Sequence, residues 1–520
     1  MLRALALLAV LALPTVATAQ FSATARLDPI RPDRTPLAAA AEVPDVFLLG
    51  LDGTTPLFVN PARAARADDR FVYGTVGDIE SQFGSGVPIS FDALFGTRDR
   101  RWLVSIDNAI ASTSSTNEAA FTRITEPDGG TTVTNDQDRL QQLDADRVAT
   151  RARVVLVGRT DFGGYAVGLF GGYRTNRTER LTDDTRRNVT DQTFGPTRRV
   201  QSSRQLFESL LDEGTDEYGI GIEAAFAGKR WDLAASLSYQ GRTTSITLVN
   251  SNRSEQEFVE MSGGEIVSSN LSRIEQDNER EADASPSGVD FEILGTIRSG
   301  LSRGDYLFGL VTGTFASGSA DLRTEDFSEQ TIQTQSGGET SVDVITFEDD
   351  AAFDRDLGTW AGRLSLGYVY AHKRRGLTVL AGVNPHVTFL SADFLDASLF
   401  TPFVGTFTEV DDRTISLDLP LHVEAPVSRR LALFGGGLYR YTFASFDVAQ
   451  RPIRGEDEPP IPFPVVIEES QRRETDTVFT NARLYAGALL TLRSGLTAQA
   501  AFRGDLAAYS GWTVSIGYRF

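Results

Sequence analysis

Cysteine is missing from this chain and histidine is scarce, and both facts exclude kinds of chemistry. With no cysteine, the protein forms no disulfide, no thiolate metal site and no lipid-modified cysteine. Only three of the 520 residues are histidine, the side chain used most often for acid–base catalysis and metal binding. No nucleophile elbow, phosphate-binding loop or metal motif is present. We therefore predict no catalytic residue, no metal site and no cofactor.

Long apolar runs and excess positive charge are also lacking. After residue 20, no stretch approaches the roughly 20 apolar residues that a membrane-spanning helix needs. If the protein lies in a membrane, it must therefore be a closed β-barrel. The formal net charge of −20 opposes nucleic-acid binding, which depends on Lys and Arg at phosphates. We expect no nucleic-acid partner and an acidic, solvated surface.

The N-terminus has the pattern of a secretory signal peptide. One positive charge, Arg3, precedes an apolar run that reaches Val16, and small residues follow at Ala17 and Ala19. This pattern predicts a signal peptide over residues 1–19 and a mature chain from Gln20. The protein is then expected to leave the cytoplasm.

The final nine residues alternate without a break between apolar and polar or small side chains. Such a period of two places one apolar face on a strand, as in a barrel with lipid outside and water inside. An amphipathic edge strand of a soluble sheet is the alternative. The segment resembles the closing strand of bacterial outer-membrane β-barrels, which implies recognition by the barrel-assembly machinery. The residues that carry this assembly signal are Trp512, Val514, Ile516, Tyr518 and Phe520.

Further alternating segments come in pairs with very short joins, and long polar stretches separate the pairs. Short turns at one end and long loops at the other are typical of an outer-membrane barrel. We predict an all-β, antiparallel, up-and-down barrel over residues 70–520 with about 14 strands, or 16 if residues 70–77 and 87–95 form one more hairpin. The stretches expected as long extracellular loops are 113–146, 175–215, 249–287, 322–357, 391–410 and 445–475.

Residues 20–69 differ from the barrel because repeated prolines prevent a regular ladder. The segment ends with Asn60-Pro61-Ala62, shortly before the first expected strand. A tripeptide of this kind resembles the FadL-type family of hydrophobic-compound transporters and its relatives in secretion machinery. The resemblance implies an N-terminal hatch inside the barrel. An ordinary turn before a strand is the alternative.

One polar stretch contains four apolar residues at helical spacing. They suggest a short amphipathic helix that ends near Gly214. The helix would either capture a hydrophobic ligand at the extracellular mouth or pack on neighbouring loops to cover it. The four residues are Leu206, Phe207, Leu210 and Leu211.

Charged residues on the polar faces of the expected strands are predicted to line the lumen. They would orient a solute by its charge, or pair across the lumen to stiffen the barrel or fix a plug. The candidates are Arg363, Arg440, Arg483, Arg503, Arg519, Glu292, Asp418 and Glu424.

Together these features predict a protein of the outer membrane of a Gram-negative bacterium, in contact with lipid and lipopolysaccharide. Its expected function is passive transport of hydrophobic or small molecules. Two alternatives remain: a secretion-associated interaction or assembly barrel that transports nothing, and a general diffusion porin. The protein is not expected to be an enzyme.

Overall fold

The structure is a computed structural model of the 520-residue chain. It describes residues 22–24, 47, 49, 55–67, 70–81, 84–97, 99–128, 131–194, 196–298, 304–336, 339–374, 376–397, 404–454, 471–492, 495–505 and 509–520. The expected signal peptide, residues 1–19, lies outside this set. No helix in the described ranges is long and apolar enough to cross a membrane.

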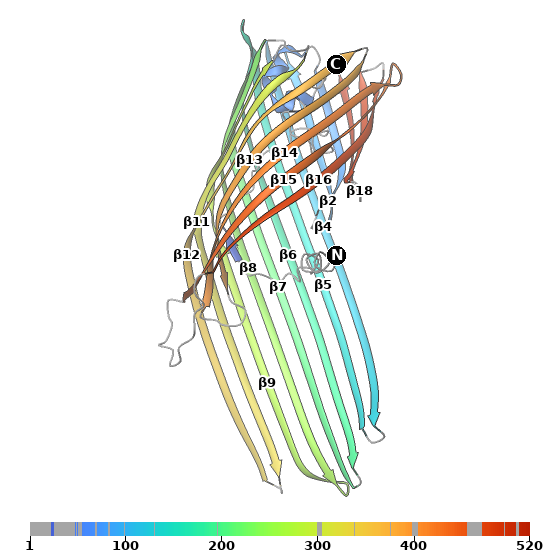
Figure 1. Ribbon diagram of the computed structural model, residues 1–520, viewed down its shortest axis with the longest axis vertical. Helices are drawn as coiled ribbons and strands as arrows, with labels where there is room; N and C mark the ends of the chain where they lie inside the picture. The colour runs from blue at the N-terminus through green and yellow to red at the C-terminus, as the bar shows by residue number, and fades with distance from the viewer. Residues whose placement is uncertain are drawn as a thin grey trace.

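Almost every described residue belongs to one antiparallel sheet that closes on itself (Figure 1). Two short helical segments, α4 (Thr55–Val59) and η1 (Pro61–Arg66), precede the barrel strands. The strands are β1 (Ser22–Thr24), β2 (Phe71–Ser81), β3 (Gly84–Gly96), β4 (Arg100–Asp128), β5 (Thr131–Arg159), β6 (Gly163–Phe194), β7 (Thr197–Gly228), β8 (Trp231–Ser262), β9 (Glu265–Ala284), β10 (Ser287–Arg298), β11 (Tyr306–Ser336), β12 (Glu339–Arg374), β13 (Leu377–Ala397), β14 (Val404–Pro426), β15 (Leu431–Arg454), β16 (Gln471–Thr491), β17 (Leu496–Asp505) and β18 (Tyr509–Arg519).

The barrel wall has 16 strand positions. β9 and β10 share one position, because both pair with β8 on one side and β11 on the other. They are separated by Ser285 and Pro286, and proline has no N–H to continue the ladder. The preferred count of 14 strands was therefore too low. The extra hairpin considered for residues 70–77 and 87–95 exists as β2 and β3.

The last strand closes the cylinder by pairing with the first. β18 runs antiparallel to β2, and the backbone groups of Phe520 and Arg70 exchange two hydrogen bonds of 3.0 and 3.1 Å. The alternation predicted for the final nine residues is present. Val514, Ile516 and Phe520 are exposed on the outer face, whereas Ser515 is buried.

Exposed apolar side chains form a belt around the outside of the barrel, as expected of a surface that faces lipid. Three tryptophans belong to this belt: Trp102, Trp231 and Trp360 are each more than 40% exposed. Trp231 stacks on Phe226 with a ring-centroid distance of 4.6 Å, beside the short β7–β8 turn. The end of the barrel that carries this turn is called the turn end below, and the opposite end the far end.

Eight strands continue past the far rim of the barrel as a free-standing sheet (Figure 1, bottom). The ladder between β3 and β4 stops at Ala111. When the paired residues are followed from each strand to the next, starting at Ala111, the row reaches Arg355 on β12. Residues 112–146, 177–214, 245–283 and 321–354, beyond that level, are called the projecting sheet. Strand portions of about 16 residues extend roughly 50 Å at 3.3 Å per residue.

The projecting sheet corrects the expectation of long extracellular loops. Four of the predicted loops, 113–146, 175–215, 249–287 and 322–357, are mostly strand, with only two residues between the paired strands at each tip. The other two, 391–410 and 445–475, also contain strand at both ends. The sequence pattern was misleading because this sheet extends beyond the barrel, so neither face has to present a regular apolar row to lipid.

Candidate functional site

The Asn60-Pro61-Ala62 motif lies inside the barrel at the turn end. Asn60 begins η1: its side-chain oxygen accepts a hydrogen bond of 3.1 Å from the backbone N–H of Ala62. Its side-chain amide donates to the carbonyl of Phe226 on β7, also at 3.1 Å. Pro61 suits the first helical position because its fixed φ is helical and the missing N–H is not needed there. Asn60 therefore both starts the helix and attaches it to the wall.

Two arginines of η1 extend this attachment. Arg63 forms a salt bridge to Asp232 of β8, with its Nη2 2.5 Å from Oδ2, and donates to the carbonyl of Leu49 at 2.7 Å. Arg66 donates to the carbonyls of Ala227 and Gly228 at 3.1 and 3.3 Å. These carbonyls end β7, so Arg66 satisfies acceptors that the short turn leaves open.

Two arginines of the wall donate in the opposite direction, toward the N-terminal segment. Arg101 of β4 donates to the carbonyl of Ala64 at 3.1 Å. Arg153 of β5 donates to the carbonyl of Phe58 at 3.1 Å, and its other nitrogens hold Glu223 of β7 at 2.6 Å. Both arginines are buried. Residues 55–67 are thus bound to the strands β4, β5, β7 and β8, or to their turns.

The helix η1 also packs closely against the wall, at β6. A side-chain carbon added at Gly164 of β6 would lie 2.1 Å from the carbonyl oxygen of Ala62, which is closer than any real contact. Glycine is therefore required for the helix to approach this strand. Ala62 and Ala64 are completely buried. Phe47, Leu49 and residues 55–67 are called the inner segment below.

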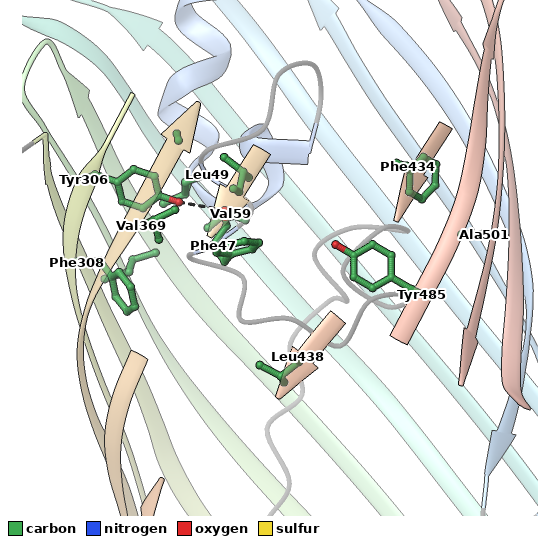
Figure 2. Close-up of a cluster of buried hydrophobic side chains, with 13 residues drawn as sticks. Phe47, Leu49, Val59, Tyr306, Phe308, Val369, Phe434, Leu438, Tyr485 and Ala501 are labelled. Atoms are coloured by element: carbon green, nitrogen blue, oxygen red, sulfur yellow. Dashed lines mark hydrogen bonds between the residues drawn. The ribbon is translucent and has the colours of Figure 1, made fainter. Parts of the chain in front are cut away.

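An apolar cluster joins the inner segment to the opposite wall (Figure 2). Phe47, Leu49 and Val59 lie beside Tyr306 of β11, whose hydroxyl donates to the carbonyl of Phe47 at 3.0 Å. Other wall residues in this lumen cluster are Leu294, Phe308, Val369, Ala371, Leu380, Phe434, Leu438, Tyr485 and Ala501. The lumen near the turn end is consequently lined by large apolar side chains.

A charged cluster surrounds Asp418 of β14, one of the predicted lumen charges. The Asp418 side chain is completely buried, and Arg440 of β15 donates to its two oxygens at 2.6 and 3.1 Å. Arg363 of β12 approaches to 3.9 Å and the Nδ1 of His386 to 3.7 Å. The pairing across the lumen that was one of the two expected roles is not found at Asp418, because its partners lie on β12, β13 and β15 of the same wall.

Among the remaining predicted lumen charges, Glu292 interacts electrostatically with Arg363 and so belongs to the Asp418 cluster. Arg519 donates to the hydroxyl of Tyr73 on the adjacent β2 at 2.9 Å. Glu292 and Glu424 are half-buried and Arg483 is exposed, and each takes part in an interaction within the chain. The side chain of Arg503 lies outside the described residues. The eight candidates therefore do not form one site.

The helix expected around Leu206 is absent. Residues 204–214 belong to β7, so Leu206 and Leu210 share one face of the strand while Phe207 and Leu211 share the other. Helical spacing was misleading because successive pairs such as Leu210–Leu211 also fit a strand with apolar residues on both faces. The idea of one apolar capture face built from all four residues is therefore wrong.

Leu211 nevertheless contacts an apolar cluster on the inner face, where the projecting sheet meets the barrel. This rim cluster also includes partly buried Ile246 and Phe407. Near it, β1 pairs with residues 394–396 of β13, beyond the last β12–β13 pair. The buried members of the rim cluster are Leu248, Ala282, Ala284, Ala320, Leu322, Ala351, Phe353, Leu357 and Leu395.

Sequence reasoning did not single out the arginines that hold the inner segment. Arg153 stands directly before an apolar run, Val154 to Val157. Arg63 and Arg66 follow the motif directly. A basic residue on the inward face of a strand, close to a motif expected inside the barrel, is the signal that was available.

The comparisons with known proteins give structural neighbours only. No family model matches the chain, and no curated protein matches it in sequence. Among solved structures, the toluene transporter TodX from Pseudomonas putida covers 90% of this chain and 93% of its own, with a TM-score of 0.30 and 12% identity. TodX is a FadL-type hydrocarbon channel, and its likeness to this chain is weak.

Two barrels of other kinds are also similar. The translocator domain of the autotransporter NalP from Neisseria meningitidis matches 63% of this chain and 90% of its own, with a TM-score of 0.24 and 15% identity. A ferric enterobactin receptor, PfeA, from Pseudomonas aeruginosa matches 87% of this chain and 81% of its own, with a TM-score of 0.23 and 7% identity.

Proposed function

We propose that the protein is an outer-membrane barrel that lets small hydrophobic molecules pass, with residues 20–69 as a hatch that keeps the pore closed at rest. The observation that carries this proposal is the inner segment, which is bound at the turn end to inward-facing side chains of the wall. A barrel of 16 strands is wide enough to leave an aqueous channel unless something fills it. The outward apolar belt supports a location in lipid.

The lining of the lumen supports a hydrophobic solute. The interior of a diffusion porin is polar and filled with water. Here, the lumen cluster near the inner segment and the rim cluster at the far end are both apolar. The carboxylate of Asp418 is already held by Arg440, so it is not free to bind a hydrophilic solute. An apolar molecule entering at the far end would leave water at the rim cluster and meet the hatch at the lumen cluster.

The test is uptake into liposomes that contain the purified full chain. An encapsulated dye that responds to a small aromatic hydrocarbon reports apolar uptake, and liposome swelling in a neutral sugar reports diffusion of hydrophilic solutes. We expect hydrocarbon uptake above that of empty liposomes, and swelling only after residues 20–69 are deleted. Swelling by the intact chain would identify a porin. Failure of both assays, even with the deletion, would exclude transport.

A second candidate function is supported by the projecting sheet. A transporter for a hydrophobic solute has no evident need for a sheet that extends about 50 Å beyond the rim. An outer-membrane barrel that binds a partner protein would use such a surface. This interaction role is compatible with transport, and its chemistry can be examined separately.

A further inference from the structure

The projecting sheet carries a net negative charge equal to that of the whole chain. Its residues 112–146, 177–214, 245–283 and 321–354 contain 33 Asp and Glu against 13 Lys and Arg, a net charge of −20. The formal net charge of all 520 residues is also −20. The barrel and N-terminal region are therefore neutral in sum, and the acidity belongs to the part that extends from the membrane.

Within this sheet, Asp and Glu side chains are concentrated on the outer face of β9, β11 and β12. Like charges stand directly opposite each other in two rows: Asp283, Asp321 and Asp354 form one, and Glu279, Glu325 and Asp350 form the other. Opposed like charges destabilise a sheet. With Glu281 and Glu348 these residues define the acidic corner. All eight side chains are exposed, and none forms a salt bridge within the described chain.

The acidic corner ends at an unpaired strand edge. The last pair between β12 and β13 joins Thr359 to Ala392, so residues 339–357 of β12 pair with β11 only. Every second backbone N–H and C=O in this stretch points away from the sheet without a strand partner among the described residues. A long open edge of this kind is a template for an added strand, and soluble proteins usually cover or shorten it.

The side chains along this edge change character from tip to barrel. Val342, Val344, Ile345 and Phe347 are each 56 to 60% exposed near the tip. Acidic residues follow, from Glu348 to Asp356. A strand that adds here meets apolar side chains in one half and carboxylates in the other, so the edge specifies a pattern as well as a backbone ladder.

A second copy of the chain does not fit this edge. The other open edge of the projecting sheet, residues 112–128 of β4, would run antiparallel to β12 if two barrels stood side by side in one membrane. That segment has three acidic residues and one arginine, and residues 339–357 have seven acidic residues and one arginine. Two edges of the same sign repel, so the occupant must carry positive charge.

We propose that the open edge of β12 binds an extended segment of a partner protein by strand addition, and that this segment is basic and then apolar in its N-to-C direction. The order follows from antiparallel pairing, the more stable arrangement. β12 runs from its apolar tip toward the acidic stretch and the barrel, so an antiparallel partner begins opposite the acids. Backbone hydrogen bonds supply affinity, and the alternating side chains supply specificity.

The experiment uses the folded full chain in detergent and a fluorescent synthetic peptide of 12 residues. Its first half has Lys or Arg at alternate positions, its second half has Val or Ile at alternate positions, and Thr or Ser fills the rest. Fluorescence anisotropy measures the dissociation constant. A peptide with the two halves exchanged tests direction, and one methylated on alternate backbone nitrogens tests the ladder.

The barrel variant Glu348→Lys, Asp350→Lys, Asp354→Lys removes the charge match. Its matched control, Asp136→Lys, Asp138→Lys, Asp183→Lys, makes the same charge change on strands that are paired on both sides. We expect at least tenfold weaker binding for the first variant, for the exchanged peptide and for the methylated peptide. The control variant should bind within about threefold of the unaltered chain.

Three results would overturn the proposal. Equal binding of the ordinary and methylated peptides would indicate simple charge attraction without a ladder. No binding of the ordinary peptide at low salt would remove the edge as a docking site for such segments. A dimer of the chain alone in sedimentation, abolished by Ile345→Lys, would assign the edge to a second copy.

Discussion

The salt bridge between Arg63 and Asp232 should control how often the pore opens. If the inner segment is a hatch, this pair is one of its anchors, and Arg63→Ala removes both the bridge and the hydrogen bond to Leu49. The change keeps the wall intact, because Arg63 belongs to no strand. It therefore perturbs the proposed hatch without altering the barrel that it closes.

The expected size of the effect follows from the burial of the pair. The side chains are 23 and 10% exposed, so the bridge is only partly screened by water. Hydrogen bonds to charged groups contribute about 1.5–3 kcal/mol each, and loss of one partner of a buried pair costs about 3–5 kcal/mol. For this partly exposed pair we take about 2–3 kcal/mol. At 1.4 kcal/mol per factor of ten, the ratio of open to closed states should rise about 30- to 150-fold.

Single-channel recording in planar bilayers measures this ratio directly. Deletion of residues 20–69 defines the fully open conductance, and Arg63→Ala should visit that level more often than the unaltered chain. Arg253→Ala is the matched control, because Arg253 pairs with Glu275 on the exposed projecting sheet and such pairs contribute little. The double variant with Asp232→Ala should add less than the sum of the two single changes. The reasoning is refuted if the deletion itself leaves the conductance unchanged, or if Arg63→Ala and Arg253→Ala behave alike.

Three further predictions follow from the closure, the fit and the acidity of the sheet. Gly164→Ala places a carbon against the carbonyl of Ala62 and should raise the open probability, while an unchanged current would contradict the close fit. Phe520→Ala keeps the backbone bonds to Arg70 but removes an apolar ring from the outer belt, at about 1.5–3 kcal/mol. The fraction of heat-modifiable, folded barrel on electrophoresis should fall, and an equal yield would count against the closing role. Burial raises the pKa of Glu213, so its ionised form destabilises the folded sheet at neutral pH and this cost disappears as the pH falls through the raised value. Glu213→Gln should slow hydrogen exchange in the projecting sheet at about pH 8 and have no effect at about pH 4. If the variant and the unaltered chain exchange at the same rate at about pH 8 as well, the destabilising effect of ionised Glu213 is refuted.

The barrel itself was predictable because a bilayer imposes a strict pattern on it. Each spanning strand has lipid on one face, so apolar residues recur at every second position, as at Val514, Ile516 and Tyr518. The same constraint identified the β2–β3 hairpin as an alternative. The count of 14 left out β2 and β3, because Gly74 and Ser90 interrupt the alternation of these two short strands.

The projecting sheet was missed because neither of its faces contacts lipid, so the constraint of strict alternation does not apply to it. A signal for its hairpins was nevertheless present in the sequence. Residue pairs that contain glycine lie near the centres of the four polar stretches, at 129–130, 195–196, 263–264 and 337–338. Gly-Gly between two β-prone segments favours a tight hairpin. Gly263 and Gly264 both have positive φ, which this type of turn requires.

The sequence by itself determined the strand pattern, the apolar face of the spanning strands and the segment expected inside the barrel, because each depends on residues that are close along the chain. Only the tertiary structure decided which groups meet. Asn60 lies 166 residues from Phe226 and Arg63 lies 169 residues from Asp232, and no local pattern specifies such pairs. The register of neighbouring strands likewise placed Arg440 opposite Asp418 and aligned three carboxylates beside an open edge. Contacts between distant segments depend on how the whole cylinder closes, and closure is a property of all 16 strands together.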